Sequence, residues 1–202
     1  MAWEIEFLKW VWENLHGLEF INEFFKYLTA AGDSWYPYVW QSVICITLVF
    51  FRKTRKTGVV LAFSLLFWGV LVNSTIIKNT VQRPRPFLED ATLLNYVQTV
   101  FNQPSGALAL PGSYSFMSGH TTNAFILATV ISFYHRKATI PLFIYASIMS
   151  FSRLFFGVHY PTDVIAGAVF ASGVSIATCY FANYLEKKIL TCRKNHAHAN
   201  TN

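Results

Sequence analysis

The chain has 202 residues and a net charge of +6; 53% of its residues are hydrophobic and only 13% are charged. This composition is too apolar for an ordinary soluble domain, and the lack of repeats or low-complexity tracts excludes fibrous and disordered classes. The three cysteines are too scattered for a disulfide framework, and no Cys/His spacing typical of a structural zinc site occurs. The composition therefore indicates a membrane protein.

The first element in chain order covers residues 3–31, where Glu and Lys residues are interspersed with Trp, Phe, Leu and Ile. This pattern predicts an amphipathic helix, within residues 1–33, that lies at the membrane interface; a sixth membrane crossing is the alternative. Gly32 and Asp33 indicate a turn after this helix, and Asp33 or Ser34 is the expected N-cap of the next one.

Five apolar stretches then approach the roughly 20 residues that a helix needs to cross a bilayer. The fourth carries a charge, Arg153, near its end, and the third reaches full length only by including residues 118–120. Among the connections, only residues 78–115 are long enough to hold structure of their own. The sequence predicts an all-α integral membrane bundle of about five transmembrane helices, and residues 1–202 form a single domain. The expected spans are 35–51, 57–77, about 116–134, 138–156 and 164–185.

The distribution of Lys and Arg among the loops predicts the orientation, because cytoplasmic loops carry the excess of positive charge. Residues 52–57 could instead form a nucleic-acid or headgroup patch, but a short cytoplasmic loop already explains their charge. We expect a multi-pass protein of the cytoplasmic (inner) membrane with a cytoplasmic basic tail, residues 186–202, and no nucleic-acid partner. The basic residues on the expected cytoplasmic side are Arg52, Lys53, Arg55, Lys56, Arg136, Lys137, Lys187, Lys188, Arg193 and Lys194.

On the opposite side, ionisable residues remain close to the ends of the spans, where they are costly and indicate function unless they pair with one another. Each has a simpler explanation when it is taken alone. Lys78 and Arg153 could extend to the headgroups, Asp163 could cap a helix, and Gly119 could ease helix packing. Antiparallel spans, however, bring all of these residues to one level of the membrane. The three groups are Lys78, Arg83 and Arg85; Ser118, Gly119 and His120; and Arg153, Gly157, His159 and Asp163.

This set of residues suits phosphoryl transfer. Cations and the N–H groups at a helix N-terminus match the spread negative charge of a transferring phosphoryl group. An imidazole with a carboxylate four residues later, as in His159 and Asp163, forms a nucleophile with its orienting group, and a second imidazole can protonate a leaving oxygen. Asp163 is the only acidic residue in these motifs, so we expect a reaction without metal or cofactor.

The three groups also resemble the signatures of the type 2 phosphatidic acid phosphatase superfamily of membrane lipid phosphatases, which is related to vanadium haloperoxidases. The signatures K-x6-R-P, P-S-G-H and S-R-x5-H-x3-D correspond to residues 78–86, 117–120 and 152–163. Two differences stand out. Met117 occupies the position of the usual Pro, which would loosen the loop. Arg83 lies outside the pattern, and either headgroup or substrate contact or plain surface exposure would explain it.

The resemblance implies a role for each residue. His159 would attack phosphorus and form a phosphohistidine, Asp163 would hold its other ring nitrogen, and His120 would protonate the leaving oxygen and later activate water. The non-bridging oxygens would be held by Lys78, Arg85, Arg153 and the backbone of Ser118 and Gly119.

The expected function is removal of a terminal phosphate from a lipid phosphate or diphosphate at the outer face of the membrane. Undecaprenyl diphosphate is the preferred substrate, because an outward site suits a carrier released on that side. Phosphatidylglycerophosphate and phosphatidate are the alternatives, and an inactive lipid-binding protein or a transport protein is the alternative of another class. Nothing in the sequence indicates an oligomeric state.

Overall fold

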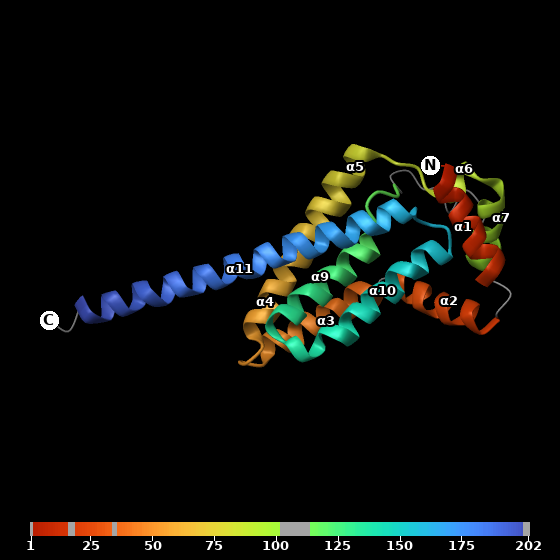
Figure 1. The fold of residues 1–202 in the computed structure, drawn as a ribbon. Coiled ribbons are helices and arrows are strands. Elements are labelled where there is room, and N and C mark those ends of the chain that lie inside the picture. Colours follow the sequence, from red (N-terminus) through yellow and green to blue (C-terminus); the bar gives the residue numbers. More distant parts are fainter. Residues whose placement is uncertain (1, 16–18, 34–35, 102–113, 200–202) are drawn as a thin grey trace.

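A computed structural model describes residues 2–15, 19–33, 36–101 and 114–199, and these residues contain helices and no strands. The prediction of an all-α chain is therefore confirmed for the described residues (Figure 1). In chain order the elements are α1 (Ala2–Leu15), α2 (Glu19–Asp33), α3 (Tyr36–Phe50), α4 (Arg55–Ser64), the π-helix η1 (Leu65–Ile77), α5 (Lys78–Val81), α6 (Pro86–Glu89), α7 (Ala91–Phe101), α9 (Gly119–Tyr134), the 3-10 turn η2 (Arg136–Ala138), α10 (Thr139–Phe155) and α11 (Pro161–Ala199).

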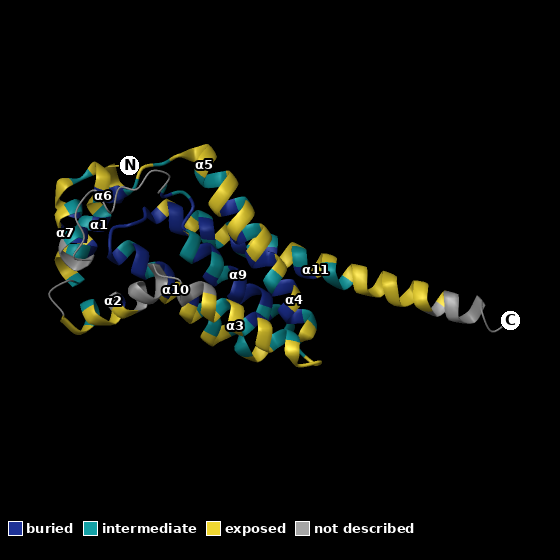
Figure 2. Cartoon of the chain, turned by 180° about the vertical axis from the view of Figure 1, so that it is seen from behind, coloured by how far each residue is buried: buried dark blue, intermediate teal, exposed yellow. Residues whose placement is uncertain are grey.

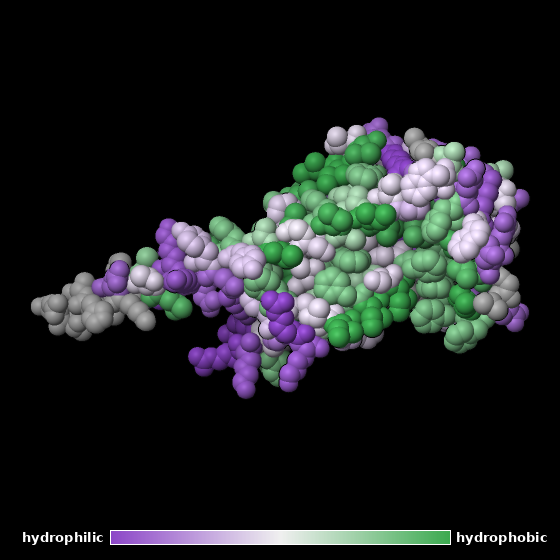
Figure 3. Space-filling view, viewed as in Figure 1, coloured by the Kyte–Doolittle hydropathy of each residue, from purple (hydrophilic) through white to green (hydrophobic). Residues whose placement is uncertain are grey.

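Three of the described helical segments are long and apolar enough to cross a membrane: Arg55–Glu89, Arg136–Phe155 and Pro161–Arg193. A shorter apolar helix covers Val39–Phe50. Hydrophobic side chains cover the middle of the bundle, and hydrophilic side chains gather toward its two ends (Figure 3). This distribution is the one expected of a protein whose middle faces lipid.

Helix α9 forms the centre of the bundle and packs against α11, α10, η1 and α4. Most of α9 is buried or partly buried (Figure 2). Its buried apolar face includes Ile126 and Val130, which belong to the same cluster as Leu61 of α4 and Ala171 of α11. The interface between α9 and α11 is close, because a Cβ on Gly167 would lie 3.1 Å from Thr122 Oγ1. Small residues allow membrane helices to approach each other in this way.

The N-terminal region differs from its prediction. The described residues of this region form two helices, α1 and α2, where one was expected, and both pack against α10. Gly32 and Asp33 continue α2 and do not form a turn, since a single glycine costs a helix only about 1 kcal/mol. The expected cap at Ser34, and the side chain of Asp33, lie outside the described residues.

Helix α11 is longer at both ends than the predicted span of residues 164–185. It starts at Pro161, a residue that suits the first turn of a helix, and it extends beyond the bundle as far as Ala199 (Figure 1). The basic tail is therefore helical over its described part. The length of an apolar run is set by the thickness of the membrane. The helix itself can be longer, because it continues through residues of high helix propensity such as Leu, Lys and Glu.

One end of the bundle carries the short helices. There α1, α6 and α7 lie near the ends of α5 and α10 and near the starts of α9 and α11 (Figure 1). The prediction that residues 78–115 hold structure of their own is confirmed for the described part, which includes α6 and α7. All three sequence groups of ionisable residues lie at this end.

Candidate active site

His159 and Asp163 lie at the centre of this end of the bundle. His159 precedes α11 and Asp163 is in its first turn, and both side chains are almost completely buried. His159 Nδ1 is 3.5 Å from Asp163 Oδ2, which is ion-pair range but longer than a good hydrogen bond, and Nδ1 has no hydrogen-bond partner among the described residues. Catalytic hydrogen bonds are often this long before substrate binds. Nε2 is the nitrogen left to react.

Asp163 is not the N-cap of α11. It is the third helical residue, and its Oδ2 accepts a hydrogen bond of 2.9 Å from the N–H of Tyr160, the residue before the helix. This is the carboxylate half of a capping box. The local helix start therefore fixes the carboxylate beside His159.

Four basic groups lie close enough to His159 to affect its protonation. Burial lowers the pKa of His159 well below its ordinary value, and the nearby positive charges lower it further because they oppose a second proton. The imidazole is therefore neutral near pH 7 and keeps a lone pair. The groups responsible are Arg85, Lys78, His120 and Arg153.

Two arginines are held by the polypeptide itself. Arg85 Nη1 donates to the carbonyl of Val158, next to His159, at 3.0 Å. Arg153 is only 1% exposed, and its Nε donates to Ser152 Oγ at 3.1 Å. The explanation that Arg153 extends to the headgroups is therefore wrong, because its charge lies inside the protein.

The start of α9 forms the second wall of the site. Ser118 is its N-cap, and its Oγ accepts from the N–H of Thr121 at 3.4 Å. The N–H of Ser118 itself donates to the carbonyl of Asp163 at 3.2 Å, so Ser118 does not offer the free backbone donor that was expected. Gly119 fits the expectation better. Its N–H precedes the first intrahelical bond, and a Cβ there would meet nothing within 4 Å, so helix packing does not explain the glycine.

Gly157 gives the turn before His159 its shape. Its φ is +61°, in the left-handed region that residues with a side chain rarely adopt. The glycine lets the chain reverse after α10 and place His159 next to the end of Arg85. Met117, in the position of the usual proline, is buried at 4% exposure, so packing holds it in place.

The explanation that Arg83 is simply exposed at the surface is wrong. Its side chain is only 15% exposed, and its guanidinium pairs with Asp163 Oδ1 and with Glu4 Oε2, each at 2.7 Å. It also lies 3.7 Å from the centre of the Tyr160 ring. Arg83 therefore acts inside the protein and contacts Asp163 directly.

The sequence arguments missed several residues around the site. Glu4 and Thr162 complete the surroundings of Arg83, and Ser115 N donates to the carbonyl of Arg83 at 2.9 Å. A signal for Glu4 existed, because it lies at positions i, i+4 and i+7 with Leu8 and Val11 on the buried face of α1. No local pattern points to Thr162 or Ser115.

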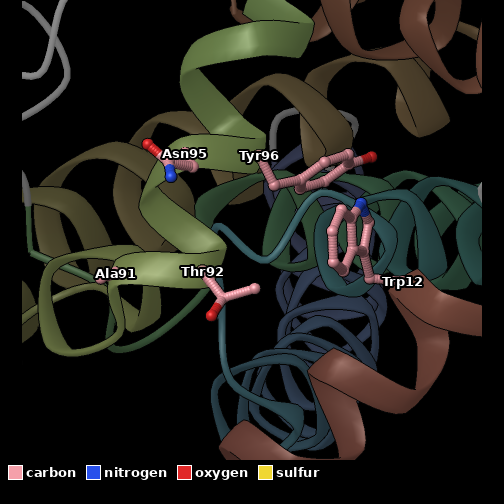
Figure 4. A pocket seen from close by; sticks show the side chains of 5 residues that line it. All are labelled: Trp12, Ala91, Thr92, Asn95 and Tyr96. Carbon is pink, nitrogen blue, oxygen red and sulfur yellow. The ribbon is translucent and has the colours of Figure 1, made fainter.

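A separate groove of about 440 Å³ lies between α1 and α7. Trp12 and Tyr96 line it with their rings in contact, the centroids 5.2 Å apart, and Ala91, Thr92 and Asn95 complete its lining (Figure 4). None of the candidate catalytic residues lines this groove. In the part of the chain that the structure describes, no group of three His, Cys, Asp or Glu side chains is arranged to hold a metal ion.

Comparison with known proteins shows the family. The PAP2 superfamily matches residues 57–187, which contain all three groups of candidate residues and most of the chain. The chain belongs to the PAP2 superfamily. It is thus a metal-independent membrane phosphatase of lipid phosphates.

Relatives within PAP2 differ in the lipid that their names specify. The chain is 29% identical over 167 residues to a lipid A 4'-phosphatase of Porphyromonas gingivalis, covering 80% of this chain and 65% of that protein. It is also 29% identical over 177 residues to an undecaprenyl-diphosphatase of Sulfolobus acidocaldarius, covering 87% of this chain and 76% of that one.

The fold is shared with a solved structure. The crystal structure of a transmembrane PAP2 type phosphatidylglycerolphosphate phosphatase from Bacillus subtilis matches with a TM-score of 0.61 at 21% identity, covering 93% of this chain and 86% of that one. This match supports the helical membrane fold. The protein is therefore an integral, multi-pass membrane protein.

Proposed function

We propose that this protein hydrolyses lipid phosphates through a phosphohistidine on His159. The observation that carries the proposal is the neutral, buried imidazole of His159, with Asp163 on one side and four basic groups around it. A neutral ring supplies the lone pair for attack, and the surrounding positive charge suits a phosphoryl group rather than a neutral substrate.

In the first step, Nε2 of His159 attacks phosphorus, an N–P bond forms and the bond from phosphorus to the leaving oxygen breaks. His120 gives its proton to that oxygen. Lys78, Arg85 and Arg153 neutralise the non-bridging oxygens, together with the N–H of Gly119. Asp163 stabilises the positive charge that develops on the His159 ring.

In the second step, water attacks the phosphohistidine. His120, now neutral, accepts a proton from the water, the new O–P bond forms and the N–P bond breaks. Inorganic phosphate leaves, and His159 is again neutral while His120 is again protonated. The two histidines therefore return to their starting states without any other proton donor.

The proposed substrate is undecaprenyl diphosphate. The similarity to an undecaprenyl-diphosphatase supports this choice, and an outward site would meet the carrier lipid where it is released. Lipid A phosphate is the second candidate, since similarity to a lipid A 4'-phosphatase is equally high at 29% identity. Both substrates present a phosphate at the membrane surface to the same cluster of charges.

We further propose five membrane spans, formed by α3, by α4 with η1, and by α9, α10 and α11. The site would face outward, because the basic loops lie at the opposite end of the bundle from His159. There Lys56 pairs with Glu186, which ties the first basic loop to α11. The C-terminal part of α11 is then cytoplasmic.

Phosphate release from a panel of lipid phosphates tests the proposal. The wild type should release phosphate fastest from undecaprenyl diphosphate, and His159→Ala should release none. His135→Ala is the matched control, because His135 lies at the opposite end, where its ring is 3.0 Å from Thr57 Oγ1. Activity retained in His159→Ala would refute the nucleophile, and a faster rate with lipid A phosphate would replace the proposed substrate.

Trapping of the intermediate assigns the two histidines. With a substrate whose leaving group needs no proton, His120→Ala should accumulate acid-labile phosphoenzyme, since its hydrolytic step lacks a base. His159→Ala should form none. A stable adduct on His120 would overturn the assignment, and a protein that binds lipid phosphates without releasing phosphate would be a binding or transport protein instead.

A further inference from the structure

Glu4 is an acidic side chain in a place where burial is costly. It lies on α1, outside the region that matches the family and outside all three motifs, yet only 3% of it is exposed. Leu8 and Val11 share its face of the helix and are also buried. A carboxylate on such a face needs a compensating set of partners.

Those partners come from the loops around the candidate site. Glu4 Oε1 accepts from Thr162 Oγ1 at 2.6 Å and from the Thr162 N–H at 3.2 Å. Glu4 Oε2 accepts from Arg83 Nη2 at 2.7 Å. Burial by itself would raise the pKa of Glu4, but these hydrogen bonds outweigh it and lower that pKa, so the carboxylate is charged near neutral pH.

Arg83 connects Glu4 to the candidate catalytic pair. Its Nη1 donates to Asp163 Oδ1 at 2.7 Å and to Thr162 Oγ1 at 2.7 Å, while Nη2 is used by Glu4. The ring of Tyr160 supports the flat face of the guanidinium. Arg83 is therefore fixed in direction by two carboxylates from distant parts of the chain.

We propose that Glu4 is a positioning residue for catalysis, and that α1 completes the active site by holding Arg83, and through it the carboxylate of Asp163, in register with His159. The proposal rests on the proposed function of His159 and Asp163. Arg83 divides its ion pairing between Glu4 and Asp163. Without Glu4, Arg83 would pair with Asp163 alone and would pull the Asp163 carboxylate away from His159 Nδ1. Without Glu4, Asp163 is both displaced and less able to hold the proton on Nδ1.

The attachment of α1 does not depend on Glu4 alone. Lys9 pairs with Asp90 at 2.5 Å, and Leu8 and Val11 pack in the same apolar cluster as Phe155. Anchoring of the helix and positioning of Asp163 can therefore be separated by substitution. Lys9→Met removes an ion pair that anchors α1 but does not involve Arg83 or Asp163. Glu4→Gln removes the negative charge that pairs with Arg83, and Arg83 in turn pairs with Asp163.

The test compares kcat, KM and melting temperature in the purified full-length protein. Glu4→Gln should lower kcat by roughly tenfold, because a small misplacement of the reacting groups lowers the rate steeply, and leave KM within about twofold. Glu6→Gln is the matched control, because it makes the same change two residues away on an exposed position of α1. Glu6→Gln should match the wild type. Lys9→Met should lower the melting temperature and leave kcat close to the wild-type value.

The protonated nitrogen of His159 is the second readout, and a purely structural role would not change it. In histidine-labelled protein, 15N NMR should show Nδ1 protonated in the wild type and in Glu6→Gln, and a mixture of both forms in Glu4→Gln. Wild-type kcat in Glu4→Gln, or a lowered kcat with an unchanged His159 signal, would overturn the proposal. If His159→Ala stays active, the proposed function has failed instead, so the two failures are distinct.

Discussion

At the scale of single residues, burial and charge determine how His159 can react. Burial is the main cause of the lowered pKa of His159, and the basic groups that suit a phosphate lower it further, because they would repel a proton on the ring. The same electrostatic field therefore favours the anionic substrate and preserves the nucleophile. An isolated histidine in water would be partly protonated below about pH 6.5 and would lose its lone pair.

The direction of this pKa shift predicts how His159 behaves in acid. Because the folded-state pKa lies below the ordinary value, the ring should stay neutral as the pH falls through about 6.5 and should protonate only at lower pH. Histidine 15N NMR between pH 5 and 8, with the His159 signal assigned by its loss in His159→Ala, measures this. A midpoint at or above 6.5 would contradict the electrostatic account of the site.

At the scale of elements, the distance between α9 and α11 sets the geometry of the site. Ser118 N donates to the carbonyl of Asp163, so the cap of one helix is bonded to the first turn of the other. Gly167 permits this approach, since a Cβ there would lie 3.2 Å from the carbonyl of Ser118. Phosphate-binding and nucleophilic groups are thereby held at a fixed separation.

We expect Gly167→Ala to separate these two helices. The added methyl should cost about 1–3 kcal/mol of stability and lower kcat several-fold, because it moves Gly119 away from His159. Gly173→Ala is the control on the same helix, where a Cβ would meet nothing within 4 Å. Melting temperature and phosphate release should fall in the first variant only, and equal behaviour of the two would show that the close approach is unimportant.

The π-helix η1 is a second feature of the elements that affects the site. It directly precedes Lys78, whose N–H donates to the carbonyl of Asn73, five residues earlier. The side-chain hydroxyls of Ser74 and Thr75 also donate to carbonyls five residues earlier. A change in helical repeat rotates every residue that follows it. The direction in which Lys78 leaves the bundle therefore depends on this segment, and π-helical turns are often found at functional sites.

At the scale of the whole molecule, the separation of charges between the two ends implies an orientation. The basic loops and the long helical tail lie at one end, and the candidate site lies at the other. In the proposed orientation, the enzyme would take its substrate from the outer leaflet and release phosphate outside. The orientation is a proposal that a labelling experiment can decide.

Cysteine labelling of intact cells tests the orientation. In a background that carries Cys192→Ser, because Cys192 is exposed, single cysteines at Arg55, Lys137 and Asn195 should not react with an impermeant reagent, whereas one at Ala91 should. Ala91 is exposed on α7, while its neighbour Leu93 is buried and would not report. Labelling of Arg55→Cys from outside would overturn both the span count and the side of the site.

The sequence was sufficient to identify the family and most of the candidate site. Five of its residues could be predicted because each lies in a short motif at the end of an apolar run, where an ionisable side chain is costly and therefore indicates function. They are Lys78, Arg85, His120, Arg153 and His159. The main helices could be located for the same reason, since membrane spans need long uncharged segments. Helix ends were less certain, and α11 and α2 extend beyond their expected ends because helix propensity continues past an apolar run or a single glycine.

Only the tertiary structure decided what Arg83 and Glu4 do. They lie 79 residues apart in the chain, and no local pattern connects a cation in a proline-rich loop to a carboxylate near the N-terminus. The sequence also suggested that Ser118 offers its N–H to phosphate, which the bond to the carbonyl of Asp163 prevents. Composition and spacing determine which residues lie at which end of a membrane bundle. The partner of each buried charge is decided by packing between distant segments, because a buried charge must pair with whatever the fold brings within reach.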